Sequence, residues 1–258
     1  MKVKIGFLDS GIGGLTVLSE ALNKVPNHEF LYYADTMHAP YGQKPKELVR
    51  QYVFDAVEFL IDQGAEVIVI ACNTATSIAA AELRQHYQIP IIGMEPAVKP
   101  ALEISQRMNK RVLVTATPLT LTEEKMKILL EKYDHHQLVD LCPLPELVRL
   151  AERFDFSDES AFSYLLEALS TYNVNDYGSI VLGCTHFPLY KKHLKRLFPE
   201  DVVIVDGSQG TVNHLIDIIG DRLGTSQSQV TFYCTGNIVK DQSELEPFQQ
   251  ILAHLSEV

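Results

Sequence analysis

The chain has 258 residues, of which 46% are hydrophobic, and a formal net charge of -11 at pH 7. This length and composition suit one large α/β unit or two smaller domains, each with its own core. No apolar stretch approaches the roughly 20 residues of a membrane span, and the N-terminal sequence has no signal-peptide pattern, so we expect a cytoplasmic protein. The negative charge disfavours nucleic acid and membrane surfaces as partners, which leaves a small molecule as the expected ligand.

Short apolar runs of β-forming residues alternate with segments of helical period along the whole chain. The runs are VKIGFLD (3–9), FLYYAD (30–35), EVIVIAC (66–72), IPIIGM (89–94), RVLVTAT (111–117), HQLVDLC (136–142), SIVLGC (179–184), VVIVDG (202–207) and VTFYCTG (230–236). This alternation predicts βα units and mainly parallel sheets. Residues 67–70 are apolar on both faces of the pleat, as expected when helices cover both sides of a sheet.

Residues 45–64 illustrate the helical segments, with Gly64 as the expected C-cap. The apolar residues at near-helical spacing are Leu48, Tyr52, Val53, Val57 and Leu60.

Two internal echoes indicate that the chain consists of two related α/β halves. Residues 65–76 and 178–188 both show an apolar run that ends in cysteine, then threonine within two positions, then a helix. A fainter echo links residues 5–15 with 111–121. Because ligands of open α/β sheets bind at the carboxyl ends of strands, two facing halves would place Cys72 and Cys184 on opposite sides of one cleft.

The first run is followed by the glycine-rich stretch DSGIGG, residues 9–14. A dinucleotide fingerprint would require glycine at position 16, where the chain has Thr16, so this stretch is a weak match to an NAD site. Its glycines suit a tight turn and an approach of backbone N–H groups to an anion at a helix N-terminus. Asp9 is either a helix N-cap or a catalytic carboxylate, and sequence statistics favour the cap.

The four cysteines are widely spaced, which predicts free thiols and neither a disulfide framework nor a zinc site. Cys72 lies at a strand-to-helix junction, where N–H groups and the helix dipole are expected to lower its pKa. A single cysteine in such a position is usually structural. Cys184 repeats the placement and has His186 two residues later, which favours a functional pair, whereas Cys142 and Cys234 are predicted to be packing residues.

Other polar residues give weaker signals. The loop ADTMHAPYG contains Asp35, Tyr41 and Gly42, and its Pro-Tyr-Gly sequence is commonly just a turn. We expect His38 to be a solvated histidine. Glu152 lies on a predicted helix and solvates one face unless the fold brings it to the site.

The stretches FLDSGIGGL, ADTMHAPYG, ACNTAT and LGCTHFPL, in this order, closely resemble the glutamate racemases of the cofactor-independent aspartate/glutamate racemase family. The resemblance covers nearly the whole chain. It implies two pseudo-symmetric three-layer α/β domains with mainly parallel sheets and the active site between them. The first domain would comprise residues 1–97 plus 208–258, and the second residues 98–207.

The resemblance also implies racemisation of L-glutamate to D-glutamate without a cofactor or metal. Racemisation removes the α-proton from one face of the substrate and delivers a proton to the other, so it requires two bases. In the family pattern Cys184 deprotonates L-glutamate and Cys72 reprotonates it. No signature of pyridoxal phosphate is present in the chain.

By resemblance, Asp9 assists Cys72, while His186 and Glu152 assist Cys184. Asp9 and His186 are also expected to contact the substrate. The remaining expected ligands are Ser10, Asn73, Thr74 and Thr185 for the amino and α-carboxylate groups, and Tyr41, Gly42, Thr117 and Thr120 for the side-chain carboxylate.

Three positions depart from the family pattern: His38 stands where arginine is usual, and Glu123 and Met126 stand where serine and tyrosine are usual. These departures put the finer substrate preference and the rate in doubt.

Alternatives remain open at this point. The same chemistry would racemise aspartate or another acidic amino acid. A Cys-His hydrolase would use Cys184 as nucleophile and His186 as base, and a non-catalytic module would only bind an amino acid. The family implies a role in supplying D-glutamate for peptidoglycan, and a homodimer is a weak expectation.

Overall fold

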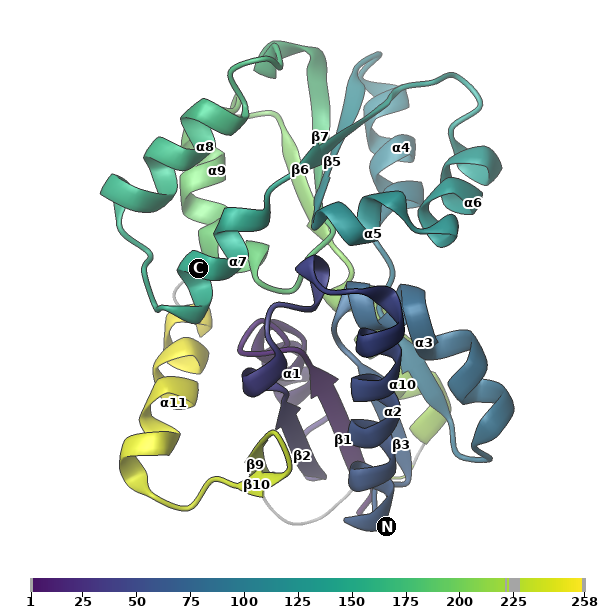
Figure 1. Ribbon diagram of the computed structural model, residues 1–258. Helices are drawn as coiled ribbons and strands as arrows, with labels where there is room; N and C mark the ends of the chain where they lie inside the picture. Colours follow the sequence, from purple (N-terminus) through teal and green to yellow (C-terminus); the bar gives the residue numbers. More distant parts are fainter. Residues whose placement is uncertain (1, 221, 223–227, 257–258) are drawn as a thin grey trace.

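A computed structural model describes residues 2–220, 222 and 228–256 of the chain. Two sheets lie at opposite ends of the molecule, and helices flank each of them (Figure 1). The strands are β1 (Lys4–Asp9), β2 (Glu29–Ala34), β3 (Val67–Ile70), β4 (Ile91–Gly93), β5 (Arg111–Ala116), β6 (Val139–Pro143), β7 (Tyr177–Leu182), β8 (Val203–Asp206), β9 (Gln229–Cys234) and β10 (Asn237–Ile238). The α-helices are α1 (Leu15–Lys24), α2 (Lys46–Asp62), α3 (Asn73–His86), α4 (Val98–Arg107), α5 (Pro118–Thr122), α6 (Glu124–Tyr133), α7 (Pro145–Glu152), α8 (Ser163–Ala168), α9 (Lys191–Leu197), α10 (Ser208–Ile219) and α11 (Gln242–Ser256).

The two sheets share one topology. The first has the strand order β10-β9-β2-β1-β3-β4 and the second β6-β5-β7-β8. The order β2-β1-β3-β4 therefore repeats as β6-β5-β7-β8, with every one of these pairs parallel. The repeat confirms the two related halves predicted from the sequence, because β3 and β7 carry the stronger echo and β1 and β5 the fainter one.

Both sheets are covered on both faces, as the apolar strand interiors predicted. In the first sheet, Phe7 and Val69 belong to a core cluster shared with α1 and α10, whereas Leu8 and Ile70 pack with α2 and α3. In the second sheet, alternate residues pack with α7 to α9 on one face and with α4 and α6 on the other. Each half is thus a three-layer unit, and the first of these clusters continues from one half into the other.

Helix α2 shows where the sequence pattern was correct and where it was wrong. Gly64 has a positive φ of 86°, its N–H donates to Ile61, and the N–H of Ala65 donates to Leu60. This is a Schellman C-cap, as expected from the glycine. Val53, Val57 and Leu60 are buried as predicted, but Leu48 is 47% exposed, because the buried stripe begins at Val49 instead.

Three further results complete the description of the fold. Strand β10, a two-residue antiparallel addition to β9, was not predicted from the sequence. All four cysteines are free thiols, as predicted. Among the described residues, none of the helices combines the length and the apolar character needed to cross a bilayer.

Candidate active site

A nearly closed cavity lies just beyond the ends of β3 and β7. Cys72 follows β3, Cys184 follows β7, and both line the cavity. Its volume is about 10 Å³, room for about one water molecule. The two cysteines are only 5% and 6% exposed. Cys72 and Cys184 are 112 positions apart in the sequence. The pseudo-symmetry of the sheets therefore brings two distant thiols to a single cavity.

Cys72 is the N-cap of α3. Its Sγ accepts the backbone N–H of Ala75 at 3.4 Å and lies 3.9 Å from the hydroxyl of Ser10. Burial raises the pKa of the Cys72 thiol to about 12, and the nearby charge of Asp9 adds to the increase. The prediction of a lowered pKa was wrong, because burial outweighs the N–H donor and the helix dipole. At neutral pH Cys72 therefore carries its proton.

Cys184 is the first member of a row that runs outward through His186 to Glu152. Sγ of Cys184 lies 3.6 Å from Nδ1 of His186, and Nε2 of His186 lies 2.6 Å from Oε1 of Glu152. Burial acts to lower the pKa of His186, but hydrogen bonds to Cys184 and Glu152 outweigh it and raise the pKa well above 6.5. A protonated imidazole beside Cys184 stabilises negative charge on that sulfur.

Asp9 is completely buried at the end of β1. Its carboxylate accepts the N–H of Gly11 at 2.9 Å and the hydroxyl of Thr185 at 3.0 Å. Burial raises its pKa to about 6, although the charge of His186 acts in the opposite direction. The statistical preference for an N-cap was wrong here, since the N-cap of α1 is Gly14 and makes no side-chain cap bond.

Backbone N–H groups of the glycine-rich loop donate hydrogen bonds to the side-chain carboxylates of Asp9 and Glu152. The N–H of Ile12 donates to Oε1 of Glu152 at 3.0 Å, while that of Gly11 donates to Asp9. A Cβ on Gly11 would overlap the Glu152 carboxylate, and one on Gly13 would lie 2.5 Å from Nδ1 of His186. The close approach predicted for this loop therefore exists, but the anion at the Ile12 N–H is the side chain of Glu152.

One amide that lines the cavity has no partner among the described residues, and a cluster of paired hydroxyls lies beside it. Within the described part of the chain, neither the nitrogen nor the oxygen of the Asn73 amide has a hydrogen-bond partner, although the residue is only 3% exposed. Beside it, the hydroxyls of Thr74, Thr117 and Thr120 form a closed cluster with separations of 2.9 to 3.1 Å. An unpaired buried amide is costly, so Asn73 is a strong candidate for a ligand contact.

The family model for Asp/Glu/hydantoin racemases matches residues 16–215. The chain belongs to the Asp/Glu/hydantoin racemase family. It is 48% identical to glutamate racemase 2 of Bacillus subtilis (strain 168), and the match covers 99% of this chain and 97% of that protein.

Solved structures of similar proteins share its fold. A glutamate racemase isoform from Bacillus anthracis has a TM-score of 0.82 at 29% identity, covering 100% of this chain and 94% of that one. The glutamate racemase of Francisella tularensis subsp. tularensis SCHU S4, solved in complex with D-glutamate, has a TM-score of 0.82 at 26% identity, covering 98% and 94%.

In this family member the loop after β2 is more ordered than its turn-like sequence suggested. The Tyr41 hydroxyl donates to Oδ2 of Asp35 at 2.6 Å, and Nδ1 of His38 lies 2.9 Å from Oδ1 of the same carboxylate. His38 also stacks on Tyr52 with ring centroids 3.8 Å apart. His38 keeps 33% of its side chain exposed and does not line the cavity, in line with the expectation of a solvated histidine, but its contacts with Asp35 and Tyr52 were not predicted.

Most residues predicted at the site line the cavity, and a few lie behind it. Those that line it are Ser10, Tyr41, Gly42, Cys72, Asn73, Thr74, Thr117, Cys184, Thr185 and His186. Asp9, Glu152 and Thr120 bond to lining residues and do not line the cavity themselves. Pro40 and Val148 also line it and were not predicted. Nothing in the sequence distinguished Val148 from the other apolar residues of its helix as a residue of the site.

None of the three positions that depart from the family pattern lines the cavity, and His38 is held in the loop after β2. Met126 is buried in the core of the second half. Glu123 is 8% exposed and forms an ion pair with Lys46, with Nζ and Oε2 2.6 Å apart. Neither residue lines the cavity, so any influence on catalysis is indirect.

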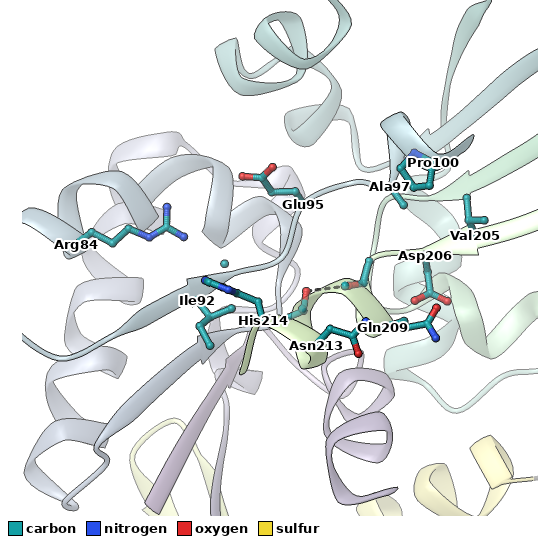
Figure 2. Close-up of a pocket in the computed structure, with 14 residues that line it drawn as sticks. Arg84, Ile92, Glu95, Ala97, Pro100, Val205, Asp206, Gln209, Asn213 and His214 are labelled. Carbon is teal, nitrogen blue, oxygen red and sulfur yellow. Dashed lines mark hydrogen bonds between the residues drawn. The ribbon is translucent and has the colours of Figure 1, made fainter. Parts of the chain in front are cut away.

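Figure 2 shows a larger hollow where the chain passes between the halves, lined by Glu95, Ala97 and residues 205–207. Its volume is about 710 Å³. No cysteine lines it, so the paired thiols belong to the small cavity alone.

Proposed function

We propose that the protein is a glutamate racemase that interconverts L- and D-glutamate by a two-base mechanism using Cys72 and Cys184. The observation that carries the proposal is the shared cavity of two cysteines that follow equivalent strands in two equivalent halves. Bases that come from pseudo-symmetric halves can face opposite sides of one α-carbon, which is what racemisation requires. The relatives named glutamate racemase support glutamate as the substrate.

The protonation pattern suits reaction from the L side. Cys72, with a pKa of about 12, holds a proton to deliver, and His186, whose pKa is raised, lies beside Cys184. The Cys184 thiolate takes the α-proton of L-glutamate, and the Cys72 thiol gives its proton to the opposite face to form D-glutamate. From D-glutamate the roles reverse. Asp9 assists at Cys72, and Glu152 acts through His186.

Stabilisation of the developing negative charge falls to fixed donors. We assign Ser10, Asn73, Thr74 and Thr185 to the amino and α-carboxylate groups. The unpaired amide of Asn73 supports this assignment, because a bound substrate would give it partners. Tyr41, Gly42, Thr117 and Thr120 are assigned to the side-chain carboxylate, with Asp9 and His186 adjoining the reacting centre.

The same symmetry supports a division into two domains. We propose a first domain of residues 1–97 plus 208–258 and a second of residues 98–207. In support, α10 packs against α1 and β4, whereas α4 packs against β5 and β7. A cavity of about 10 Å³ is too small for glutamate, so we expect the two domains to separate when substrate binds.

The physiological role we propose is supply of D-glutamate for peptidoglycan in a bacterial cytoplasm, by an enzyme that forms a homodimer. The bacterial glutamate racemases among the relatives support the first part. The dimer is carried by the family resemblance alone, and sedimentation of the purified protein would test it.

The experiment is proton NMR of L-glutamate with the purified protein in D2O, with reducing agent and no added cofactor, followed by chiral analysis. Loss of the α-proton signal with accumulation of D-glutamate is the expected result, and Cys72→Ser and Cys184→Ser should each abolish net racemisation. A preference for aspartate in a parallel reaction would show that aspartate, and not glutamate, is the substrate. Full activity of Cys72→Ser would favour a hydrolase centred on Cys184 and His186.

A further inference from the structure

One wall of the cavity is a short segment that the other half of the molecule holds by two side chains. Residues 41–46 contain Tyr41 and Gly42, which line the cavity, and end at the first residue of α2. Nη2 of Arg149 donates to Oε1 of Gln43 at 2.6 Å, and Nζ of Lys46 lies 2.6 Å from Oε2 of Glu123. Both partners belong to the half with the second sheet.

The two halves also meet next to the Lys46–Glu123 ion pair, on the side of the cavity. A Cβ built on Gly42 would lie 2.6 Å from Cβ of Thr117, so the two halves already touch at that point of the wall. The Lys46 side chain is 50% exposed and that of Glu123 is 9% exposed. The ion pair therefore bridges the halves at the solvent edge, with the Gly42–Thr117 contact on the cavity side of it.

The two charges are also adjacent in sequence to the cavity wall. Lys46 follows Gly42 by four positions, and Glu123 follows Thr120 by three. Glu123 ends α5 and is the N-cap of α6, while Lys46 begins α2. An ion pair between the first residue of α2 and the N-cap of α6 therefore restrains two loops together. These are the loops that carry the proposed ligands of the side-chain carboxylate. Glu123 is one of the positions where the chain departs from the pattern it resembles.

We propose that Lys46 and Glu123 are positioning residues whose ion pair holds segment 41–46 against the second half and keeps the cavity closed around the substrate. The pair breaks each time substrate enters or product leaves. The kinetic consequence rests on the proposed function, whereas the effect on closure does not.

The size and salt dependence of the effect follow from the exposure of the pair. Because Lys46 is half exposed, its interaction with Glu123 is partly screened by solvent, and breaking it should favour the open form by roughly twofold to fivefold. The effect should shrink as ionic strength rises beyond about 0.5 M, where the Debye length falls to a few ångströms.

The test measures closure through the buried thiols. The protein is treated with N-ethylmaleimide at low ionic strength, and modification of each cysteine is followed by peptide mass spectrometry. Lys46→Gln and Glu123→Gln should each accelerate labelling of Cys72 and Cys184 by the same factor, roughly twofold to fivefold. The exchanged pair Lys46→Glu with Glu123→Lys should restore slow labelling. High salt should accelerate labelling of the wild type and not of the single variants.

Lys127→Gln is the matched control. Lys127 lies on α6, and its Nζ is 3.9 Å from Oε1 of Glu124 in the same helix. It should label at the wild-type rate. In activity assays, Lys46→Gln should raise KM for both enantiomers with little change in kcat.

Equal labelling rates in Lys46→Gln, Lys127→Gln and wild type would overturn the proposal. So would acceleration at one cysteine only, since that points to a local change in thiol reactivity. If the wild type does not racemise glutamate, the proposed function fails, but the labelling rates still decide whether the ion pair closes the cavity.

Discussion

Nε2 of His186 and Oε1 of Glu152 lie 2.6 Å apart, and the same carboxylate oxygen accepts the N–H of Ile12. The histidine side chain is 2% exposed, and that of Glu152 is 20% exposed. A carboxylate from α7 thus bonds to the glycine-rich loop of the first half and to the histidine beside Cys184. One residue couples the closure of the two halves to the charge on His186.

Replacing Glu152 with glutamine should remove the charge and retain the shape. The pKa of His186, which hydrogen bonds to Cys184 and Glu152 raise, should fall. Activity that needs a protonated His186 is lost as pH rises through this pKa, so the alkaline limb of kcat/KM should move to lower pH. At pH 8 we expect a decrease in kcat/KM of about 100-fold, the usual size of an acid–base contribution.

The pH profile distinguishes this role from a structural one. A variant that was merely unstable would lose activity in proportion to the unfolded fraction and keep its profile. Superimposable profiles for wild type and Glu152→Gln would contradict the role of Glu152.

Gly11→Ala should reproduce this defect without replacing a titratable group. The added methyl would overlap the Glu152 carboxylate, which must then leave either His186 or the loop. We expect a loss of kcat/KM of at least about 10-fold and a shifted alkaline limb, as in Glu152→Gln. Gly210→Ala is the control, since an added Cβ there has no atom within 4 Å. Equal kinetics for the two glycine variants would refute the steric argument.

The features that could be predicted from the sequence are local. A β-run that ends in cysteine before a helix repeats in the chain, and repeated local patterns fold into equivalent elements. This is why Cys72 and Cys184 could be placed at one cleft in advance. Gly64 likewise predicted the end of α2, because glycine readily adopts the positive φ that this C-cap requires.

The features that could not be predicted depend on distant partners. The bond from Ile12 to Glu152 spans 140 positions, so nothing near either residue signals it. The pKa of Cys72 depends on how completely the folded protein buries the thiol, and this burial outweighs the effect of the helix terminus that is visible in the sequence. The stacking of His38 was not predicted because its partner, Tyr52, belongs to the next helix.

Asp9→Asn should change the pH dependence of stability. The folded pKa of Asp9 is about 6, above its ordinary value of 3.8, so the folded state holds this proton more tightly than the unfolded state does. The wild type should therefore lose stability relative to Asp9→Asn as pH rises from about 4 to 6, with the penalty fully present above that range. Between pH 4.5 and pH 8 the difference in unfolding free energy should change by about 2 kcal/mol, measured by urea denaturation. A constant difference across this range would show that Asp9 is not the buried charge responsible.

Asn73→Ala should separate binding from stability. The Asn73 amide is buried, and within the described residues both of its polar atoms lack partners, so removing it costs the folded protein no hydrogen bond. We expect thermal stability that is equal or higher, because an unpaired buried polar group is lost, together with a KM for glutamate at least about 10-fold higher. The neighbouring Thr76 gives the opposite case: its hydroxyl donates to Ile70 and accepts the N–H of Met94. Thr76→Val should cost about 1 kcal/mol of stability and leave KM unchanged. If Asn73→Ala instead unfolds at lower temperature and binds glutamate normally, then the amide serves the fold and another group must contact the substrate.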